Sequence, residues 1–113
     1  MPGVNFGDVL LARLPFPDGG GFKLRPVLVI HEHSDGDLLV VPETTHDPRG
    51  AGDTPIALWQ EAGLRLESTA RMCKFATISK VVVVKQLGSL AATDADRTQQ
   101  SLRSFLMRLS PAG

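Results

Sequence analysis

The sequence is short of several residue types, and each shortage excludes a class of protein. A single cysteine, Cys73, rules out a disulfide within the chain, which fits a reducing compartment and most simply the cytosol. The chain has no tyrosine and one tryptophan, so few aromatic side chains are available to stack on bases. No apolar run approaches the ~18 residues that cross a bilayer, and Arg13 interrupts the N-terminal apolar run where a signal peptide would need continuity. We therefore expect a cytoplasmic protein that does not enter a membrane.

Net charge is absent too, because 12 Lys and Arg balance 12 Asp and Glu, which argues against a strongly cationic nucleic-acid binder. The charges are nevertheless segregated. Residues 1–67 carry five cations and ten anions, a net −5, whereas residues 68–113 carry seven cations and two anions, a net +5. A local basic face could still bind a polyanion, but charge alone favours a solvated surface with two complementary halves.

The chain has the length and the apolar content of one small folded domain, which we expect to cover residues 1–113. Five or six short strands are predicted, at 8–16, 26–31, 38–41, 54–58, 68–78 and 81–87. We expect Pro42 to end the third strand and Val81 to Val84 to be buried on both faces. Strands this close in sequence predict a small, strongly bent, partly open antiparallel barrel.

One helix is predicted over residues 94–109 and should pack on the barrel. Thr93 is a good N-cap residue, and Asp94 complements the positive N-terminal end of the helix dipole. Apolar residues recur with helical spacing and should face the sheet: Leu102, Phe105, Leu106 and Leu109. The only tryptophan, Trp59, is expected to pack in the core or at an interface rather than to stack on a base.

A glycine-rich segment separates the first two predicted strands, at residues 15–24. It spans about ten residues, whereas hairpin loops usually have about two to five. Three consecutive glycines, 19–21, permit positive φ and favour a mobile loop that covers a functional site. The alternative is a plain connection between two strands. Lys23 and Arg25 lie where this loop re-enters the second strand, so the segment has a tendency to bind phosphate.

A polar cluster follows the third predicted strand, at Glu43, Thr44, Thr45 and His46. Strand ends are where rigid scaffolds present chemistry, so this cluster is either part of a site or a capped turn. The histidines lack the spacing of a known zinc site, and we expect surface turn residues and no metal: His31, His33 and His46.

In its motifs and their order, the chain resembles the MazF/PemK family of toxin–antitoxin toxins. The specific part is a GD strand, a PF-x-D-G loop, an R-P dipeptide and an apolar strand, and weaker matches extend to the last predicted helix. The matching segments are 7–11, 15–19, 23–30, 40–44, 63–68, Thr77 and 87–90.

This resemblance implies an SH3-like barrel, similar to CcdB, MazF and PemK, that forms a homodimer. It implies a metal-free endoribonuclease that cleaves single-stranded RNA through attack of a 2′-OH and is inhibited by a cognate antitoxin peptide. By position, Arg25 is the catalytic arginine and Thr44 its catalytic partner, with Thr45 the fallback. RNA contacts are expected on the first loop and beside Thr44, at Phe16, Gly19, Gly20, Lys23 and Thr45.

The chemistry of these residues agrees with the resemblance. An arginine can bind two phosphoryl oxygens, and a threonine hydroxyl can donate a third hydrogen bond to the charge that develops. Glu43 and His46 are candidates for the proton acceptor, although each is more simply a solvent-facing turn residue. Two alternatives remain open: a CcdB-like inhibitor of gyrase acting through its last helix, and a catalytically silent member that binds RNA or antitoxin.

Overall fold

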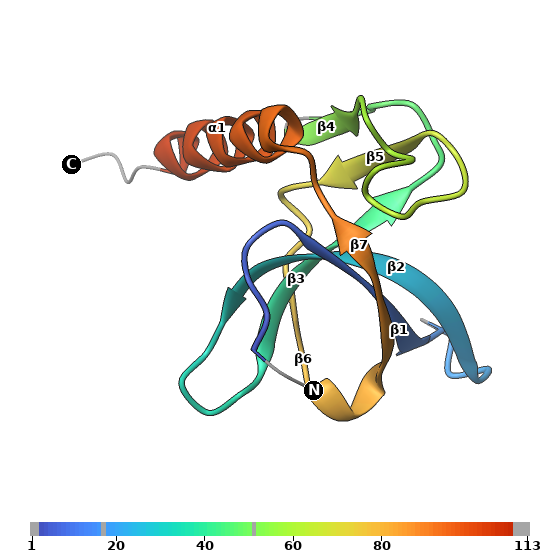
Figure 1. The fold of residues 1–113 in the computed structure, drawn as a ribbon. Helices are drawn as coiled ribbons and strands as arrows, with labels where there is room; N and C mark the ends of the chain where they lie inside the picture. The colour runs from blue at the N-terminus through green and yellow to red at the C-terminus, as the bar shows by residue number, and fades with distance from the viewer. Residues whose placement is uncertain (1–2, 17, 51, 110–113) are drawn as a thin grey trace.

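The computed structural model describes residues 3–16, 18–50 and 52–109. These residues form a mainly antiparallel sheet followed by one long helix (Figure 1). The elements are β1 (Asp8–Pro15), β2 (Phe22–Glu32), β3 (Leu38–Thr44), β4 (Asp53–Ile56), β5 (Ser68–Arg71), β6 (Ala76–Ile78), η1 (Lys80–Val82), β7 (Val83–Ser89) and α1 (Ala92–Arg108).

The sheet is open, with the strand order β4-β5-β3-β2-β1-β7, and β6 pairs separately with β3. β3 lies at the centre of this arrangement. It pairs with β2 along one edge, and with β6 and then β5 along the other. Figure 1 shows the first three strands, β6 and β7 curving into a barrel, with β4, β5 and α1 gathered at one end of it. The predicted small, partly open antiparallel barrel is therefore confirmed.

Two apolar clusters lie on opposite faces of the curved sheet. Successive side chains of a strand point to opposite faces, so Val9 and Leu10 are both fully buried, each in a different cluster. The cluster inside the barrel contains Leu10, Ala12, Val27, Val29, Leu38, Val40 and Ile78. The cluster between the sheet and its outer layer contains Val9, Leu28, Val41, Ile56, Ala70, Met72 and Leu90. Burial on both faces holds the centre of β2 and β3 in place.

The glycine-rich segment is not the ten-residue lid that the sequence predicted. β1 and β2 stay paired out to Pro15 and Phe22, and a short turn joins them. The turn is closed by a hydrogen bond from the Phe16 amide to the Gly21 carbonyl, at 2.8 Å, and Gly19 has a φ of 78°. Residues 22–24 therefore belong to an extended two-stranded arm.

Three other strand predictions also require correction. β3 continues through Pro42 to Thr44, and the predicted strand 68–78 is two strands separated by a turn. The Val81 to Val84 run is not buried: Val81 is 90% exposed in η1, and Val84 is half exposed on β7. β7 pairs only with β1 in the described sheet, so one of its edges has no covering strand.

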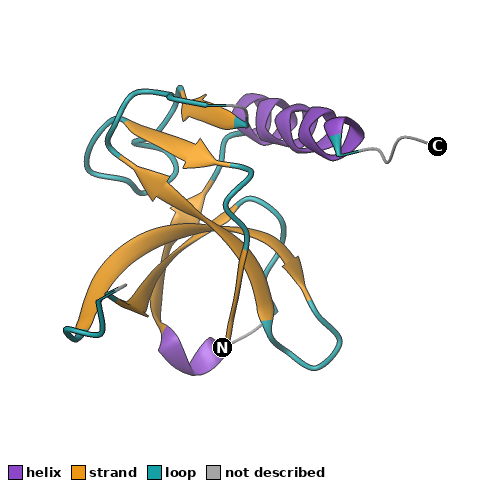
Figure 2. Ribbon diagram, turned by 180° about the vertical axis from the view of Figure 1, so that it is seen from behind, coloured by secondary structure: helices purple, strands orange, loops and turns teal. Residues whose placement is uncertain are grey.

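The helix α1 begins two residues earlier than predicted, and its N-cap residue, Ala91, makes no side-chain cap. Asp94 is fully buried, and its carboxylate accepts hydrogen bonds from the amides of Ala57 (3.0 Å) and Leu58 (2.8 Å). The predicted apolar stripe is only partly covered, because Leu102 packs on the core while Leu106 and Leu109 are at least half exposed. Figure 2 shows the helix extending past the sheet. No helix among the described residues is both long and apolar enough to cross a bilayer.

Candidate functional site

The register of the central strands places Arg25 and Thr44 on one face. Val27 of β2 is paired with Pro42 of β3, and Arg25 and Thr44 each lie two residues beyond that pair. Two residues along a strand return a side chain to the same face, so Arg25 and Thr44 point to the same side from adjacent strands. The β2–β3 ladder ends at Val27 and Pro42, so the two side chains flank the point where these strands separate.

Two further cations share this face. Lys23 lies two residues before Arg25 on β2, and both side chains are exposed. On the other side of β3, Thr44 is paired with Thr69 of β5, and Arg71 lies two residues further along β5. We call the surface formed by Lys23, Arg25, Thr44 and Arg71 the Arg25 face.

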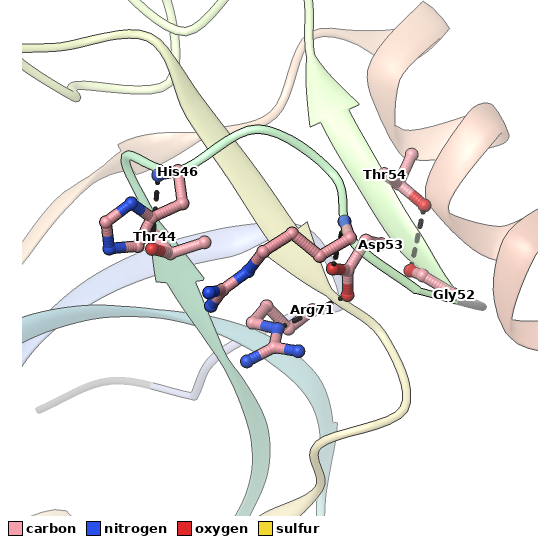
Figure 3. Close-up of polar contacts among 7 residues, drawn as sticks. Thr44, His46, Gly52, Asp53, Thr54 and Arg71 are labelled. Atoms are coloured by element: carbon pink, nitrogen blue, oxygen red, sulfur yellow. Dashed lines mark hydrogen bonds and ion pairs between the residues drawn. The ribbon is translucent and has the colours of Figure 1, made fainter.

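Arg71 is the member of the Arg25 face to which sequence reasoning gave no role. Its Nε donates to the Asp53 carboxylate at 3.3 Å, and Figure 3 shows the pair beside the end of β3 that carries Thr44. Burial works to raise the pKa of Asp53, but hydrogen bonds from the Arg49 amide and the Arg71 side chain outweigh it and hold the pKa below its ordinary value. Asp53 therefore stays ionised and holds Arg71 in place. In the sequence, the i, i+2 spacing of Thr69 and Arg71 on a predicted strand indicates that the two side chains share one face.

The Thr44 hydroxyl is oriented by its own chain. Its Oγ1 accepts a hydrogen bond from the His46 amide at 3.2 Å, as Figure 3 shows. With that contact to one lone pair, the hydroxyl keeps its hydrogen for donation to another acceptor. Thr45 lies in a bend just beyond the end of β3 and is exposed, so the cross-strand pairing that places Thr44 beside Thr69 does not extend to it.

Glu43 is buried, contrary to the expectation of a solvent-facing turn residue. The residue is 3% exposed, and neither carboxylate oxygen has a hydrogen-bond partner among the described residues. It is paired with Ala70 of β5, one residue beyond the end of the β2–β3 ladder. Burial raises the pKa of Glu43 to about 8. The side chain is therefore neutral at pH 7 and points away from the Arg25 face.

The remaining predicted contacts lie apart from Arg25. Phe16, Gly19 and Gly20 are exposed at the tip of the β1–β2 arm. The tip is five residues from Arg25 along the arm, or roughly 16 Å. His46 is exposed at the end of β3, and among the residues that the structure describes no three potential ligands are grouped to hold a metal ion.

Comparison with known proteins places this geometry in a family. The family model described as "PemK-like, MazF-like toxin of type II toxin-antitoxin system" matches residues 5–106. Among curated proteins, no sequence match was found.

Solved structures share the fold at low sequence identity. Toxin MazF-mt6 of Mycobacterium tuberculosis has a TM-score of 0.69 and 22% identity over 88% of this chain and 96% of its own. An endoribonuclease in complex with its cognate antitoxin, from a mycobacterial species, has a TM-score of 0.74 and 15% identity over 96% of this chain and 100% of its own. MazF of Deinococcus radiodurans has a TM-score of 0.69 and 16% identity over 95% and 98%.

The family model covers most of the chain, and the structural neighbours share its fold. The motifs that it spans include the R-P dipeptide at Arg25 and the strand end at Thr44. The chain therefore belongs to the PemK-like, MazF-like toxins of type II toxin–antitoxin systems.

Proposed function

We propose that this protein is an endoribonuclease that cleaves single-stranded RNA on the Arg25 face. The observation that carries the proposal is the register of β2 and β3, which brings Arg25 and Thr44 to one face from adjacent strands. In addition, one structural neighbour is described as an endoribonuclease and another as MazF.

The reaction needs donors for developing negative charge. The 2′-oxygen of one nucleotide attacks the adjacent phosphorus, the bond from phosphorus to the 5′-oxygen breaks, and the products are a 2′,3′-cyclic phosphate and a 5′-hydroxyl. Arg25 can bind two phosphoryl oxygens with its planar guanidinium, and the Thr44 hydroxyl can donate its hydrogen to a phosphoryl oxygen as a third hydrogen bond. These donors supply the charge stabilisation without a metal ion.

The flanking cations extend this chemistry along the RNA. Lys23 and Arg71 lie on either side of the Arg25–Thr44 pair, on the same face, and can each neutralise a neighbouring phosphate. Asp53 holds the Arg71 guanidinium by its Nε, which leaves the terminal nitrogens for a phosphate. Affinity for RNA should accordingly fall as salt rises.

The reaction also needs a group that accepts the 2′-OH proton. Glu43 is unsuited, because it is buried, protonated at pH 7 and directed to the opposite face from Thr44. His46 is exposed, adjoins Thr44 through its amide, and remains the candidate. Replacement of His46 with glutamine should lower the cleavage rate.

Cleavage of a single-stranded RNA by the purified protein tests the proposal, with the end groups of the products identified by enzymatic labelling. Arg25→Ala should lower the rate by about 100-fold or more, the usual effect of removing one such donor. Arg13→Ala is the matched control, since Arg13 is an exposed arginine on the adjacent strand whose side chain points to the other face. Equal losses in both variants, or undiminished cleavage in Arg25→Ala, would refute the assignment.

The partners belong to the same proposal. We expect a cytoplasmic homodimer inhibited by a cognate antitoxin peptide, and the mycobacterial neighbour was solved with such a partner. Exposed apolar side chains, Leu24 and Leu66, line a groove of about 470 Å³ and give an assembly apolar surface to bury. Light scattering on the purified protein tests the dimer. Nothing in the comparisons favours the gyrase alternative.

A further inference from the structure

A pocket of about 330 Å³ opens at the shared end of three strands. β3 and β4 end here, at Thr44 and Ile56, and β5 begins here, at Ser68. Trp59 and the polar residues Thr45, His46 and Thr69 are among the residues that line it. We call this cavity the Trp59 pocket.

Trp59 is held between the outer apolar cluster and the pocket. It is partly buried and packs against the outer apolar cluster, and it also lines the pocket. Its backbone is held in a hydrogen-bonded turn, because its carbonyl accepts from the Leu64 amide at 3.1 Å. The preceding residue, Leu58, is tied through its amide to buried Asp94. The ring is thus a rigid surface that costs little to order when a planar group stacks on it.

The charges around the pocket favour a base over a phosphate. No lysine or arginine lines it, whereas Asp47 and Glu67 do. Carboxylates repel phosphate, but they accept hydrogen bonds from the exocyclic amino group of a base. The lining therefore fits a planar ring that bears amino hydrogens.

The pocket also adjoins the proposed catalytic threonine by two separate contacts. Thr69, which lines it, is the cross-strand partner of Thr44. His46, which also lines it, donates its amide hydrogen to Thr44 Oγ1. Paired residues on neighbouring strands lie about 5 Å apart, so Thr44 is one cross-strand pair away from a residue that lines the pocket.

We propose that the Trp59 pocket binds the nucleobase next to the scissile phosphate and prefers bases with an exocyclic amino group to uracil. This inference rests on the proposed ribonuclease function and adds the determinant of its sequence preference. Trp59 supplies the stacking surface, and Glu67 and Asp47 accept hydrogen bonds from the amino group.

Intrinsic fluorescence provides a direct test, because Trp59 is the only tryptophan and the chain has no tyrosine. The Arg25→Ala variant is titrated with 2′-O-methyl oligonucleotides, which cannot be cleaved, at low salt. Oligonucleotides of cytosine or adenine should change Trp59 emission saturably and bind about tenfold more tightly than those of uracil. An abasic oligonucleotide should leave the emission unchanged.

Two variants separate base binding from folding. Trp59→Leu should weaken binding about tenfold, with partial recovery in Trp59→Phe, which keeps a ring. Because Trp59 also packs on the core, Glu67→Gln provides a second variant at an exposed position, and it should reduce the preference for cytosine over uracil. Glu61→Gln is its matched control, since Glu61 is exposed and does not line the pocket.

The outcomes distinguish this inference from the ribonuclease proposal. If RNA is cleaved but neither Trp59 emission nor base preference responds as described, the inference is wrong and the ribonuclease proposal stands. If oligonucleotides bind at Trp59 with the stated preference but RNA is never cleaved, the ribonuclease proposal is wrong and the base site stands. A response to an antitoxin peptide and to no oligonucleotide would overturn the base site.

Discussion

Glu43 should make this protein less stable as the pH rises through the neutral range. Burial raises its pKa from the ordinary value of 4.5 to about 8, and no described group hydrogen-bonds to its carboxylate. Between these two values the folded state keeps a proton that the unfolded state has released. The free energy of unfolding then falls by about 1.4 kcal/mol per pH unit, from about pH 4.5 to about pH 8, and levels off above.

The full effect of this one carboxyl group is about 5 kcal/mol, taken from the distance between the two pKa values. That is comparable with the whole stability of many small domains. Glu43→Gln removes the ionisation and keeps the shape, so its stability should be nearly independent of pH in this range. At pH 8.5 the variant should be the more stable protein, and at pH 5 the two should be similar.

Urea unfolding at five values between pH 5 and pH 9, followed by Trp59 fluorescence, measures this slope. Asp53 and Glu32 have lowered pKa values, so the stability they add is present above their unfolded values and is lost only in acid, below this range. Glu61→Gln, at an exposed position, is the control and should keep the wild-type slope. A wild type equally stable at pH 5.5 and pH 8.5 would refute the argument, as would a Glu43→Gln variant with an unchanged slope.

Three other substitutions test the packing. Gly63→Ala should cost about 3 kcal/mol or more, because its φ is +85° and a Cβ would lie 2.1 Å from the Leu87 carbonyl oxygen. Gly50→Ala, where a Cβ would meet nothing within 4 Å, is the control and should be nearly neutral. Asp94→Ala should cost about 3 kcal/mol, because it leaves two backbone amides without their acceptor. Val81→Ser should change stability by less than about 0.5 kcal/mol, since Val81 is 90% exposed. Denaturant midpoints measure the stability of all four variants. A large loss of stability in Val81→Ser, or none in Gly63→Ala, would contradict these predictions.

The barrel could be predicted from the sequence because its signals are local. Alternating apolar residues, glycines between strands and one helical stripe each act over a few residues. The strand predictions were wrong where contacts between residues far apart in the chain decide the structure. Val81 to Val84 has strong strand propensity, but these residues lie in η1 and on a strand whose second edge is uncovered, and that position depends on the whole topology.

In the candidate site, too, local motifs predicted some features and strand pairing decided the others. The R-P motif located Arg25, and the strand end located Thr44, but their common face follows from the β2–β3 register, which no local pattern gives. Glu43 looked exposed because it precedes a polar turn. Its burial depends on the pairing of β3 with β5, where Ala70 lies opposite Glu43 and is 27 residues away in the chain.

Because successive side chains of β3 alternate between two faces, the ionisation of Glu43 should affect catalysis by Thr44. The two residues are adjacent and point to opposite faces, so Glu43 cannot turn outward to reach water without rotating the strand end that holds the Thr44 hydroxyl. RNA cleavage should therefore decline above about pH 8 in the wild type, as Glu43 ionises and this end of the strand opens. Glu43→Gln should keep its activity to higher pH, because its side chain has no charge to hydrate. Initial cleavage rates between pH 7 and pH 9.5 measure the difference, and identical profiles for the two proteins would show that Thr44 does not respond to Glu43.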